Sequence, residues 1–336
     1  MRSMTAVVHR DARLLRLEEI PVPEPAAGEV LVEVLANGIC GSDLHVWKLP
    51  VREGELRVLG HEIAGRIAGT GVMGAVYAGG QCGLCPLCRA GLGHFCRDAQ
   101  HLGSTGTPGL GGLAPFVAVR AEHVLPAPVG LEPALITLAE PLANALRALD
   151  RPEVDHAATA VIIGCGPLGL VHLAALRHLG VDRVIAIEGR PRRRDAAIEL
   201  GAEAVLDPRE DISARVAAHF GIGPDLVVEA VGTKGTTHLA TDLVRPRGSV
   251  FLMGVCGEPF RVNTLRWLNK ELTIRTSIGA SREEHERALS LVASGAIDLS
   301  GLITRRVALA DAPTMFDALD AGADEIKVVV THDHGR

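Results

Sequence analysis

The chain has 336 residues, of which 47% are hydrophobic and 22% charged, and its formal net charge is −6. This length favours two domains over a single core. The composition argues against a disordered chain, and the acidic balance argues against a nucleic-acid partner.

The first twenty residues, MRSMTAVVHRDARLLRLEEI, carry charges every few positions and lack the apolar core of a secretory signal. We therefore expect a cytoplasmic protein. The most apolar stretch, residues 157–176, is long enough to span a bilayer. Its three glycines, its proline and His172 favour a buried strand, turn and helix instead, so we expect no membrane partner.

Short alternating runs broken by Gly and Pro extend from residue 1 to about 140 and predict a β-rich, barrel-like domain. EVLVEVLANGI predicts a strand over residues 30–39, and HEIAGRIAG predicts a second one. LAPFVAVRAEHVLPAP predicts a pair of strands closed by Pro126 and Pro128.

From about residue 155, five apolar runs alternate with helical segments: TAVIIG, RVIAIE, AEAVLD, DLVVEAVG and GSVFLMGV. This alternation predicts a doubly wound parallel sheet. Beyond it, SREEHERALSLVASG predicts an amphipathic helix that stops at Gly295, and EIKVVVTHD predicts a strand. We therefore expect the sheet domain to be inserted into the β-rich one, with domains at 1–142, 143–271 and 272–336.

Four of the seven cysteines fall in one short loop, residues 82–96, with C-x2-C-x2-C-x7-C spacing. In a reducing compartment this spacing indicates metal ligands, and four thiolates form a closed, structural zinc site. An iron–sulfur cluster, disulfides or reduced thiols are the alternatives. The expected structural-zinc ligands are Cys82, Cys85, Cys88 and Cys96.

A G-x-G-x-x-G pattern follows the first apolar strand of the sheet domain and precedes a helical run, and it is formed by Gly164, Gly166 and Gly169. In this context it predicts a dinucleotide site: the glycines allow the turn, the approach of a pyrophosphate and close helix packing. The pyrophosphate is expected at the helix N-terminus, beside Pro167 and Leu168.

The next strand ends at Glu188, where a carboxylate is expected to accept hydrogen bonds from the adenosine ribose and to repel a 2′-phosphate. We therefore expect NAD. NADP stays open, because arginines at 190 and 192–194, Arg193 among them, could bind that phosphate. Gly232, after the fourth strand, either passes close to the cofactor or is a turn glycine.

Cys40 lies in GICGSDLH, outside the four-cysteine loop. A catalytic zinc takes about three protein ligands from Cys, His and carboxylate. His61, Glu62 and Glu140 are candidates to join Cys40, although the residues alone leave open whether they converge.

The chain resembles the zinc-dependent medium-chain alcohol and polyol dehydrogenases, most of all the sorbitol/threonine dehydrogenase branch. The resemblance covers nearly the whole length and is carried by GICGSDLH, GHE, the four-cysteine loop, EPLANAL, GCGPLG, LITRRVALADAPTMFDAL and IKVVV. It implies a GroES-like catalytic domain, a Rossmann domain, and a homodimer or homotetramer.

The resemblance implies that Cys40 and His61 ligate a catalytic zinc. It implies that Glu62 and Glu140 are the carboxylates that ligate it directly or exchange with its water. In the branch that oxidises simple alcohols the third ligand is a cysteine, and this chain has Glu140 instead.

The same resemblance makes Ser42 the hydroxyl that accepts the substrate proton and His45 the group that passes it to solvent. It makes Asp43 the carboxylate that orients the histidine ligand. The implied reaction is hydride transfer between NAD(P) and a secondary hydroxyl of a polyol, amino alcohol, cyclitol or sugar-derived substrate. There are two alternatives: a threonine-type dehydrogenase, which Asn144 favours, and a catalytically silent homologue.

Five further histidines and the two remaining cysteines are expected to be structural. We expect Cys165 and Cys256 to be small apolar fillers. We expect five histidines to lie at the surface: His94, His101, His123, His332 and His334.

Overall fold

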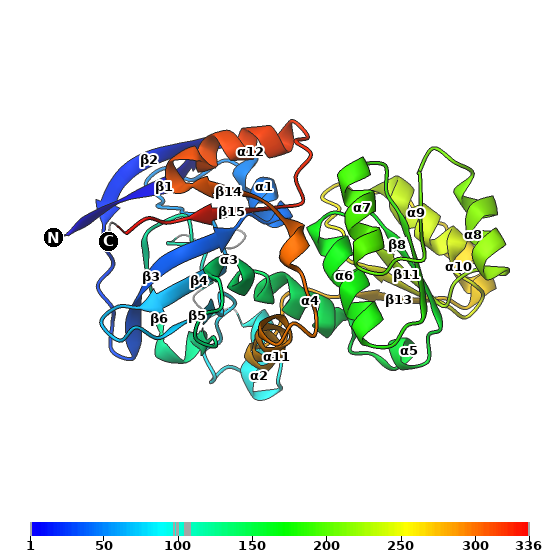
Figure 1. Ribbon diagram of the computed structural model, residues 1–336, viewed down its shortest axis with the longest axis horizontal. Helices are drawn as coiled ribbons and strands as arrows, with labels where there is room; N and C mark the ends of the chain where they lie inside the picture. The colour runs from blue at the N-terminus through cyan, green and yellow to red at the C-terminus, as the bar shows by residue number, and fades with distance from the viewer. Residues whose placement is uncertain (1, 97, 99–100, 104–108, 335–336) are drawn as a thin grey trace. The chain divides into compact units, whose positions relative to one another are not determined.

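The structure is a computed structural model that describes residues 2–96, 98, 101–103 and 109–334. The chain forms two compact units (Figure 1). The first combines Met1–Ala143 with Gly279–Arg336, and the second is Asn144–Ile278. The second unit is therefore an insertion into the first.

The first unit is built on a seven-stranded mixed sheet in the order β14-β15-β3-β4-β5-β7, with β6 also paired to β3. β14 and β15 are parallel, and the other pairs are antiparallel. A separate antiparallel pair is formed by β1 (Ser3–Asp11) and β2 (Leu14–Pro21). The sheet strands are β3 (Glu29–Gly38), β4 (Glu62–Ile67), β5 (Met73–Val76), β6 (Phe116–Arg120), β7 (Val124–Pro126), β14 (Ile303–Ala308) and β15 (Lys327–Thr331).

The predicted pairing of the two strands in LAPFVAVRAEHVLPAP is wrong. A 3-10 turn, η2 (Ala121–His123), separates β6 from β7 and sends them to different partners. β6 pairs with β3 and β7 pairs with β5. Alternation along a run predicts a strand but does not determine its neighbour, because the partner is chosen by long-range packing.

Short helices complete this unit. The expected amphipathic helix, α11 (Arg282–Ala293), begins with a capping box, in which Ser281 and Glu284 each accept a hydrogen bond from the other's backbone N–H. The helical segments are α1 (Gly41–Trp47), α2 (Pro86–Arg89), η1 (Gly93–Phe95), α3 (Pro133–Ile136), α11 (Arg282–Ala293), η3 (Ser300–Leu302), η4 (Leu309–Asp311) and α12 (Ala312–Asp320). α4 (Ala139–Leu149) runs across the division between the units.

The C-terminal end of α1 is anchored in the core of the first unit. Trp47 is buried, and its ring meets Phe316 edge-on at a centroid distance of 5.9 Å. Its carbonyl oxygen accepts hydrogen bonds from the Arg13 N–H at 2.7 Å and from His9 Nε2 at 3.1 Å. These contacts fix the helix that carries Ser42, Asp43 and His45.

The second unit is a parallel six-stranded sheet in the order β10-β9-β8-β11-β12-β13. α6 packs on β8, β9 and β11, and α9 packs on β11 and β12 (Figure 1). The strands are β8 (Thr159–Ile163), β9 (Arg183–Ile187), β10 (Ala204–Leu206), β11 (Leu226–Glu229), β12 (Ser249–Leu252) and β13 (Thr273–Thr276). The helices are α5 (Pro152–Asp155), α6 (Pro167–His178), α7 (Pro191–Glu199), α8 (Ile212–Phe220), α9 (Lys234–Leu243) and α10 (Thr264–Lys270).

The predicted fold class is confirmed: a β-rich domain is combined with a domain built on a parallel sheet, β10-β9-β8-β11-β12-β13, of the doubly wound type. All five strands expected from the apolar runs are present. The sixth, β13, pairs in parallel with β12 and lies beyond residue 271. Its sequence, TIRT, lacks the apolar run that marks the other five.

Two side chains differ from their predicted environments. His123 is 5% exposed, not at the surface, and its ring packs edge-on against Tyr77 at a centroid distance of 5.4 Å. Cys256 is exposed, whereas Cys165 is buried as expected. Among the described residues, no helix has the length and apolar character needed to cross a membrane.

His172, on α6, is completely buried, and its Nδ1 donates a hydrogen bond to the Leu168 carbonyl oxygen at 2.7 Å. Burial lowers the pKa of His172 to about 4, from an ordinary value of 6.5. The unfolded chain therefore takes up a proton before the folded chain does, so stability is lost as the pH falls from 6.5 toward 4.

We expect His172 alone to lower the free energy of unfolding by about 2 kcal/mol between pH 7 and pH 5. Urea unfolding at both pH values measures this, since His172→Leu should show a pH-dependent loss smaller by that amount. His178→Leu, at an exposed position of the same helix, is the control and should behave as the wild type. An equal loss in His172→Leu and the wild type would contradict the assignment.

Candidate functional site

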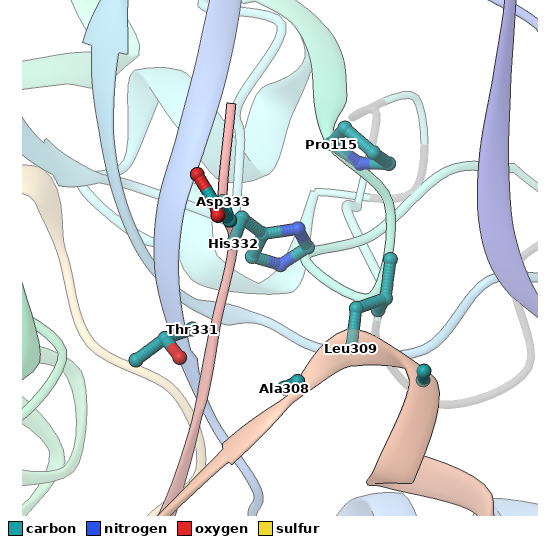
Figure 2. A pocket seen from close by; sticks show the side chains of 7 residues that line it. Pro115, Ala308, Leu309, Thr331, His332 and Asp333 are labelled. Carbon is teal, nitrogen blue, oxygen red and sulfur yellow. The ribbon is translucent and has the colours of Figure 1, made fainter. Parts of the chain in front are cut away.

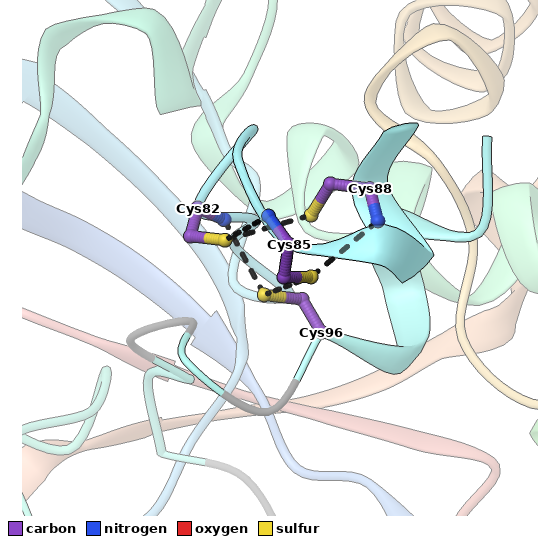
Figure 3. Close-up of side chains that lie close together, drawn as sticks. All are labelled: Cys82, Cys85, Cys88 and Cys96. Atoms are coloured by element: carbon purple, nitrogen blue, oxygen red, sulfur yellow. Dashed lines mark hydrogen bonds between the residues drawn. The ribbon is translucent and has the colours of Figure 1, made fainter. Parts of the chain in front are cut away.

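The four cysteines of the loop converge on one point (Figure 3). Their sulfur atoms all lie within 4.8 Å of one another, with Cys82–Cys88 at 3.9 Å and Cys85–Cys96 at 3.8 Å. Four sulfurs at about 2.3 Å from a tetrahedral zinc would be separated by about 3.8 Å. The spacing therefore fits a four-thiolate zinc site.

Backbone N–H groups point at the thiols of this loop. Cys82 Sγ accepts hydrogen bonds from the N–H groups of Leu84 at 3.4 Å and Cys85 at 3.3 Å. These bonds lower the pKa of Cys82 to about 6, whereas burial raises the pKa of Cys88 to about 12. All seven cysteines are described and free, so the structure contains no disulfide in this loop.

Cys40 precedes α1 and has an extended conformation, with φ −97° and ψ 155°. Its backbone N–H donates to Oδ2 of Asp43 at 2.9 Å, the reciprocal half of a helix capping box. GICGSDLH therefore folds locally because Asp43 satisfies the start of its own helix. The same turn sets the position of the Cys40 thiol.

His61 meets this turn from the residue just before β4. Its Nδ1 lies 3.2 Å from Oδ1 of Asp43, and its Nε2 lies 3.4 Å from Oγ of Ser42. Burial opposes the charged imidazolium, but Asp43 outweighs it and raises the pKa of His61 well above its ordinary value. Asp43 thus orients the ring so that Nε2 is the nitrogen directed toward the Ser42 side.

The structure brings together three of the four residues expected at a catalytic metal. The ligand atoms of Cys40, His61 and Glu62 lie within 4.8 Å of one another. Among the described residues, Glu140 is not part of this group, but it is close enough for its charge to raise the pKa of Lys327. A soft thiolate, an imidazole and a carboxylate form a donor set that suits Zn²⁺.

Sequence reasoning missed Lys327 as part of this region. Its Nζ lies 2.7 Å from both carboxylate oxygens of Glu62, and both side chains are buried. Burial disfavours the ammonium, but attraction to Glu62 outweighs it, and the pKa of Lys327 is raised. In the sequence, the only indication of this role was a single charged residue at the start of the apolar strand IKVVV.

His45, the expected end of a proton path, is exposed on α1. It follows Ser42 by three residues, so the two side chains lie on the same face of the helix. Ser42 itself is only partly buried. The helix therefore presents one hydroxyl at the cluster and one imidazole at the solvent.

The glycine pattern forms the predicted strand, turn and helix. Gly164 follows β8 with φ 88°, and Gly166 is the N-cap of α6, which begins at Pro167. A Cβ at Gly169 would collide with the carbonyl oxygen of Gly164. The first and third glycines are thus required by backbone conformation and by close packing.

Glu188 follows β9 and binds backbone N–H groups. One oxygen accepts from Cys165 at 2.8 Å, inside the glycine pattern, and the other accepts from Gly189 at 2.8 Å and Arg190 at 2.9 Å. The carboxylate therefore joins the glycine loop to the turn after β9. A cofactor that used Glu188 would find it held in place.

The structure also places Arg193 and Gly232, two further residues predicted to contact the cofactor. A Cβ built on Gly166 would lie 3.7 Å from Nη1 of Arg193, which puts the guanidinium beside the glycine loop. Gly232 has φ 81°, and a Cβ there would collide with the backbone of Val255. Backbone packing alone accounts for glycine at 232.

A cavity of about 430 Å³ in the first unit lies outside these sites (Figure 2). His332 lines it and hydrogen-bonds through Nε2 to the Gly112 carbonyl oxygen at 2.9 Å. None of its lining residues is a predicted ligand or cofactor residue. They are Pro115, Ala308, Leu309, Ala310, Thr331, His332 and Asp333.

Comparison with known proteins now places the chain in a family. The alcohol dehydrogenase GroES-like domain matches residues 26–129, and the zinc-binding dehydrogenase family matches residues 167–294. A 2-dehydro-3-deoxy-L-galactonate 5-dehydrogenase of Pseudoalteromonas atlantica is 32% identical over 91% of this chain and 92% of its own. The chain belongs to the zinc-binding alcohol dehydrogenase family.

Other similar proteins support the same family assignment. An L-threonine 3-dehydrogenase of Rhizobium etli is 29% identical over 95% of this chain and 96% of its own. A putative zinc-binding dehydrogenase of Sinorhizobium meliloti, solved with NADP bound, is 31% identical, has a TM-score of 0.88, and matches 98% of this chain and 100% of its own. This zinc-binding alcohol dehydrogenase is an NAD(P)-dependent oxidoreductase that acts on CH–OH groups.

Zinc analysis of the purified dehydrogenase should find about two ions per chain, one in each donor set. Cys85→Ser should lose the ion of the four-cysteine loop, and Cys40→Ser should lose the other. Cys256→Ser, at an exposed cysteine outside both sets, should keep both. Elemental analysis by mass spectrometry measures the content, and iron in place of zinc in the loop would contradict the assignment there.

Proposed function

We propose that this enzyme transfers a hydride between a nicotinamide cofactor and a secondary hydroxyl or ketone of a polyol, amino alcohol, cyclitol or sugar-derived substrate. The observation that carries the proposal is the cluster of Cys40, His61 and Glu62, with Ser42 3.4 Å from the histidine. It combines a metal donor set with a hydroxyl that can take part in proton transfer.

Cys40 and His61 are the proposed holders of the catalytic zinc, with Glu62 or Glu140 as the carboxylate beside it. When bound, Zn²⁺ supplies Lewis-acid polarisation of the substrate oxygen. Asp43 holds the His61 ring through Nδ1 and holds the Cys40 turn through its N–H. The two ligands thus share one orienting carboxylate.

The proton of the substrate hydroxyl leaves through the chain's own side chains. Ser42 Oγ is the proposed first acceptor, because it faces the cluster and is partly buried. His45 is the proposed last group, because it shares the helix face and is exposed. Reduction of a ketone would use the same groups in the opposite order.

Two features support a polar substrate. The family resemblance aligns Glu140 with the cysteine of enzymes for simple alcohols, so we propose that Glu140 adds a negative charge near the cluster. The relatives named for a sugar acid and for threonine match almost the whole chain. A threonine-type activity is the second candidate, on the strength of the threonine dehydrogenase match.

NAD is the proposed cofactor. Three backbone N–H groups hold the Glu188 carboxylate at the end of β9, where its charge disfavours the 2′-phosphate of NADP. The proposed cofactor contacts are Gly164, Gly166, Pro167, Leu168, Gly169, Glu188, Arg193 and Gly232. We further propose a cytoplasmic location, because free thiol ligands persist in a reducing compartment. A homodimer or homotetramer is proposed from the family resemblance alone.

The proposed function is tested by following the change in nicotinamide absorbance with polyols, amino alcohols including threonine, cyclitols and sugar acids, and with the corresponding ketones in the reverse direction.

Ser42→Ala should lower kcat by about 10²-fold while the zinc content stays unchanged, because only the proton route is lost. Wild-type turnover in Ser42→Ala would remove the serine from the mechanism. Cofactor binding without turnover of any substrate would favour a catalytically silent protein.

Cofactor titration should show NAD binding about tenfold or more tightly than NADP, from charge repulsion at Glu188. Glu188→Gln keeps one oxygen as an acceptor and removes the charge, so NADP should gain affinity relative to NAD. Isothermal calorimetry with both cofactors measures the ratio. A wild-type preference for NADP would instead assign the phosphate to the arginines that follow Glu188.

A further inference from the structure

Lys327, the first residue of β15, is one of the most deeply buried charges in the described part of the chain. Its side chain is 1% exposed, and that of its partner Glu62 is 0% exposed. Burying two opposite charges costs several kcal/mol per ion unless geometry and hydrogen bonding compensate. An arrangement this demanding calls for an explanation beyond stability.

The Lys327 ammonium uses its full hydrogen-bonding capacity. It donates to both oxygens of Glu62 at 2.7 Å and to the carbonyl oxygen of Ile39 at 3.2 Å. An ammonium has three N–H donors, and all three are accounted for. A carboxylate bound through both oxygens in this way offers no free bidentate position to a metal.

The position of Glu62 is also built into the sheet. Gly38 on β3 is directly opposite Glu62 on β4 in the antiparallel register. A Cβ at Gly38 would collide with Oε2 of Glu62. The carboxylate therefore lies over a gap left by glycine, facing the ammonium.

Lys327 joins the two chain segments that carry the metal ligands. Ile39 directly precedes Cys40, and Glu62 directly follows His61. The N–H of Ile39 also donates to the carbonyl oxygen of Val328 at 2.9 Å. The start of β15 is thus attached to both segments, by backbone and by side chain.

We propose that Lys327 is a positioning residue of the metal site: it retains the Glu62 carboxylate beside the metal and prevents it from becoming a permanent ligand. The inference rests on the proposed zinc site of Cys40 and His61. The cation near the metal also opposes metal binding by charge repulsion. Retaining Glu62 in this way leaves a coordination position for substrate.

Cobalt substitution tests this independently of turnover, because Co²⁺ absorption reports the ligand set. The cobalt spectrum of Cys40→Ser, which keeps only the four-cysteine site, is subtracted from each spectrum. In Lys327→Met, Glu62 is released to the metal. The cobalt bands should shift, and the zinc dissociation constant, measured by chelator competition, should fall about tenfold.

Glu62→Gln is the matched variant. If Lys327 retains the carboxylate in the wild type, removing its charge should leave the cobalt bands in place. The zinc dissociation constant should rise about tenfold, because the lysine charge is then uncompensated. In Glu62→Gln/Lys327→Met the bands should return to their wild-type positions.

A cobalt shift in Glu62→Gln would overturn the proposal, since Glu62 would then be a ligand in the wild type. Unchanged bands and unchanged or weaker zinc binding in a folded Lys327→Met would overturn it too. If Lys327→Met does not fold, the Glu62→Gln spectrum decides. If Cys40→Ser loses no metal, the proposed zinc site itself fails, which is a different result.

Discussion

The arrangement of the site depends on two contacts made by the carboxylate of Asp43. It accepts the N–H of Cys40 with one oxygen and lies against Nδ1 of His61 with the other. One buried side chain therefore orders a helix start and orients an imidazole from a distant segment, just before β4. Asp43 is buried, so both contacts lie in an environment of low dielectric constant, where hydrogen bonds are electrostatically stronger than in water.

Much of this architecture is readable from local sequence. The cysteine loop and the glycine pattern are each continuous, so their geometry follows from turns within about fifteen residues. The alternation of apolar runs and helices identifies the parallel sheet, because each unit of that sheet is also local. The capping contact of Asp43 is local in the same way, because the N–H that it accepts belongs to Cys40, three residues earlier. Its expected contact with the histidine ligand came from the family resemblance alone.

The parts that could not be predicted depend on distant neighbours. Nothing within LAPFVAVRAEHVLPAP indicates that its two strands bind β3 and β5. The burial of His123 depends on packing against Tyr77, and β13 is a strand because β12 is beside it. Lys327 reads locally as an ordinary strand-end charge, and only the folded sheet places it on Glu62. The sequence suggested Glu62 and Glu140 together as carboxylates of the site; among the described residues only Glu62 has an oxygen in the donor cluster, although Glu140 is close enough to act on Lys327 by its charge.

The insertion of one unit into the other also sets an order of synthesis. Glu62 and Lys327 are 265 residues apart, which the ribosome takes roughly 15 to 50 seconds to translate at about 5–20 residues per second. During that interval Asn144–Ile278 emerges as a continuous segment that contains all the strands of its own sheet. The segment that carries Cys40, in contrast, lacks its contacts with β15 until the end of synthesis. A nascent chain therefore exposes the donor set of Cys40, His61 and Glu62 to cellular metals well before Lys327 has been made.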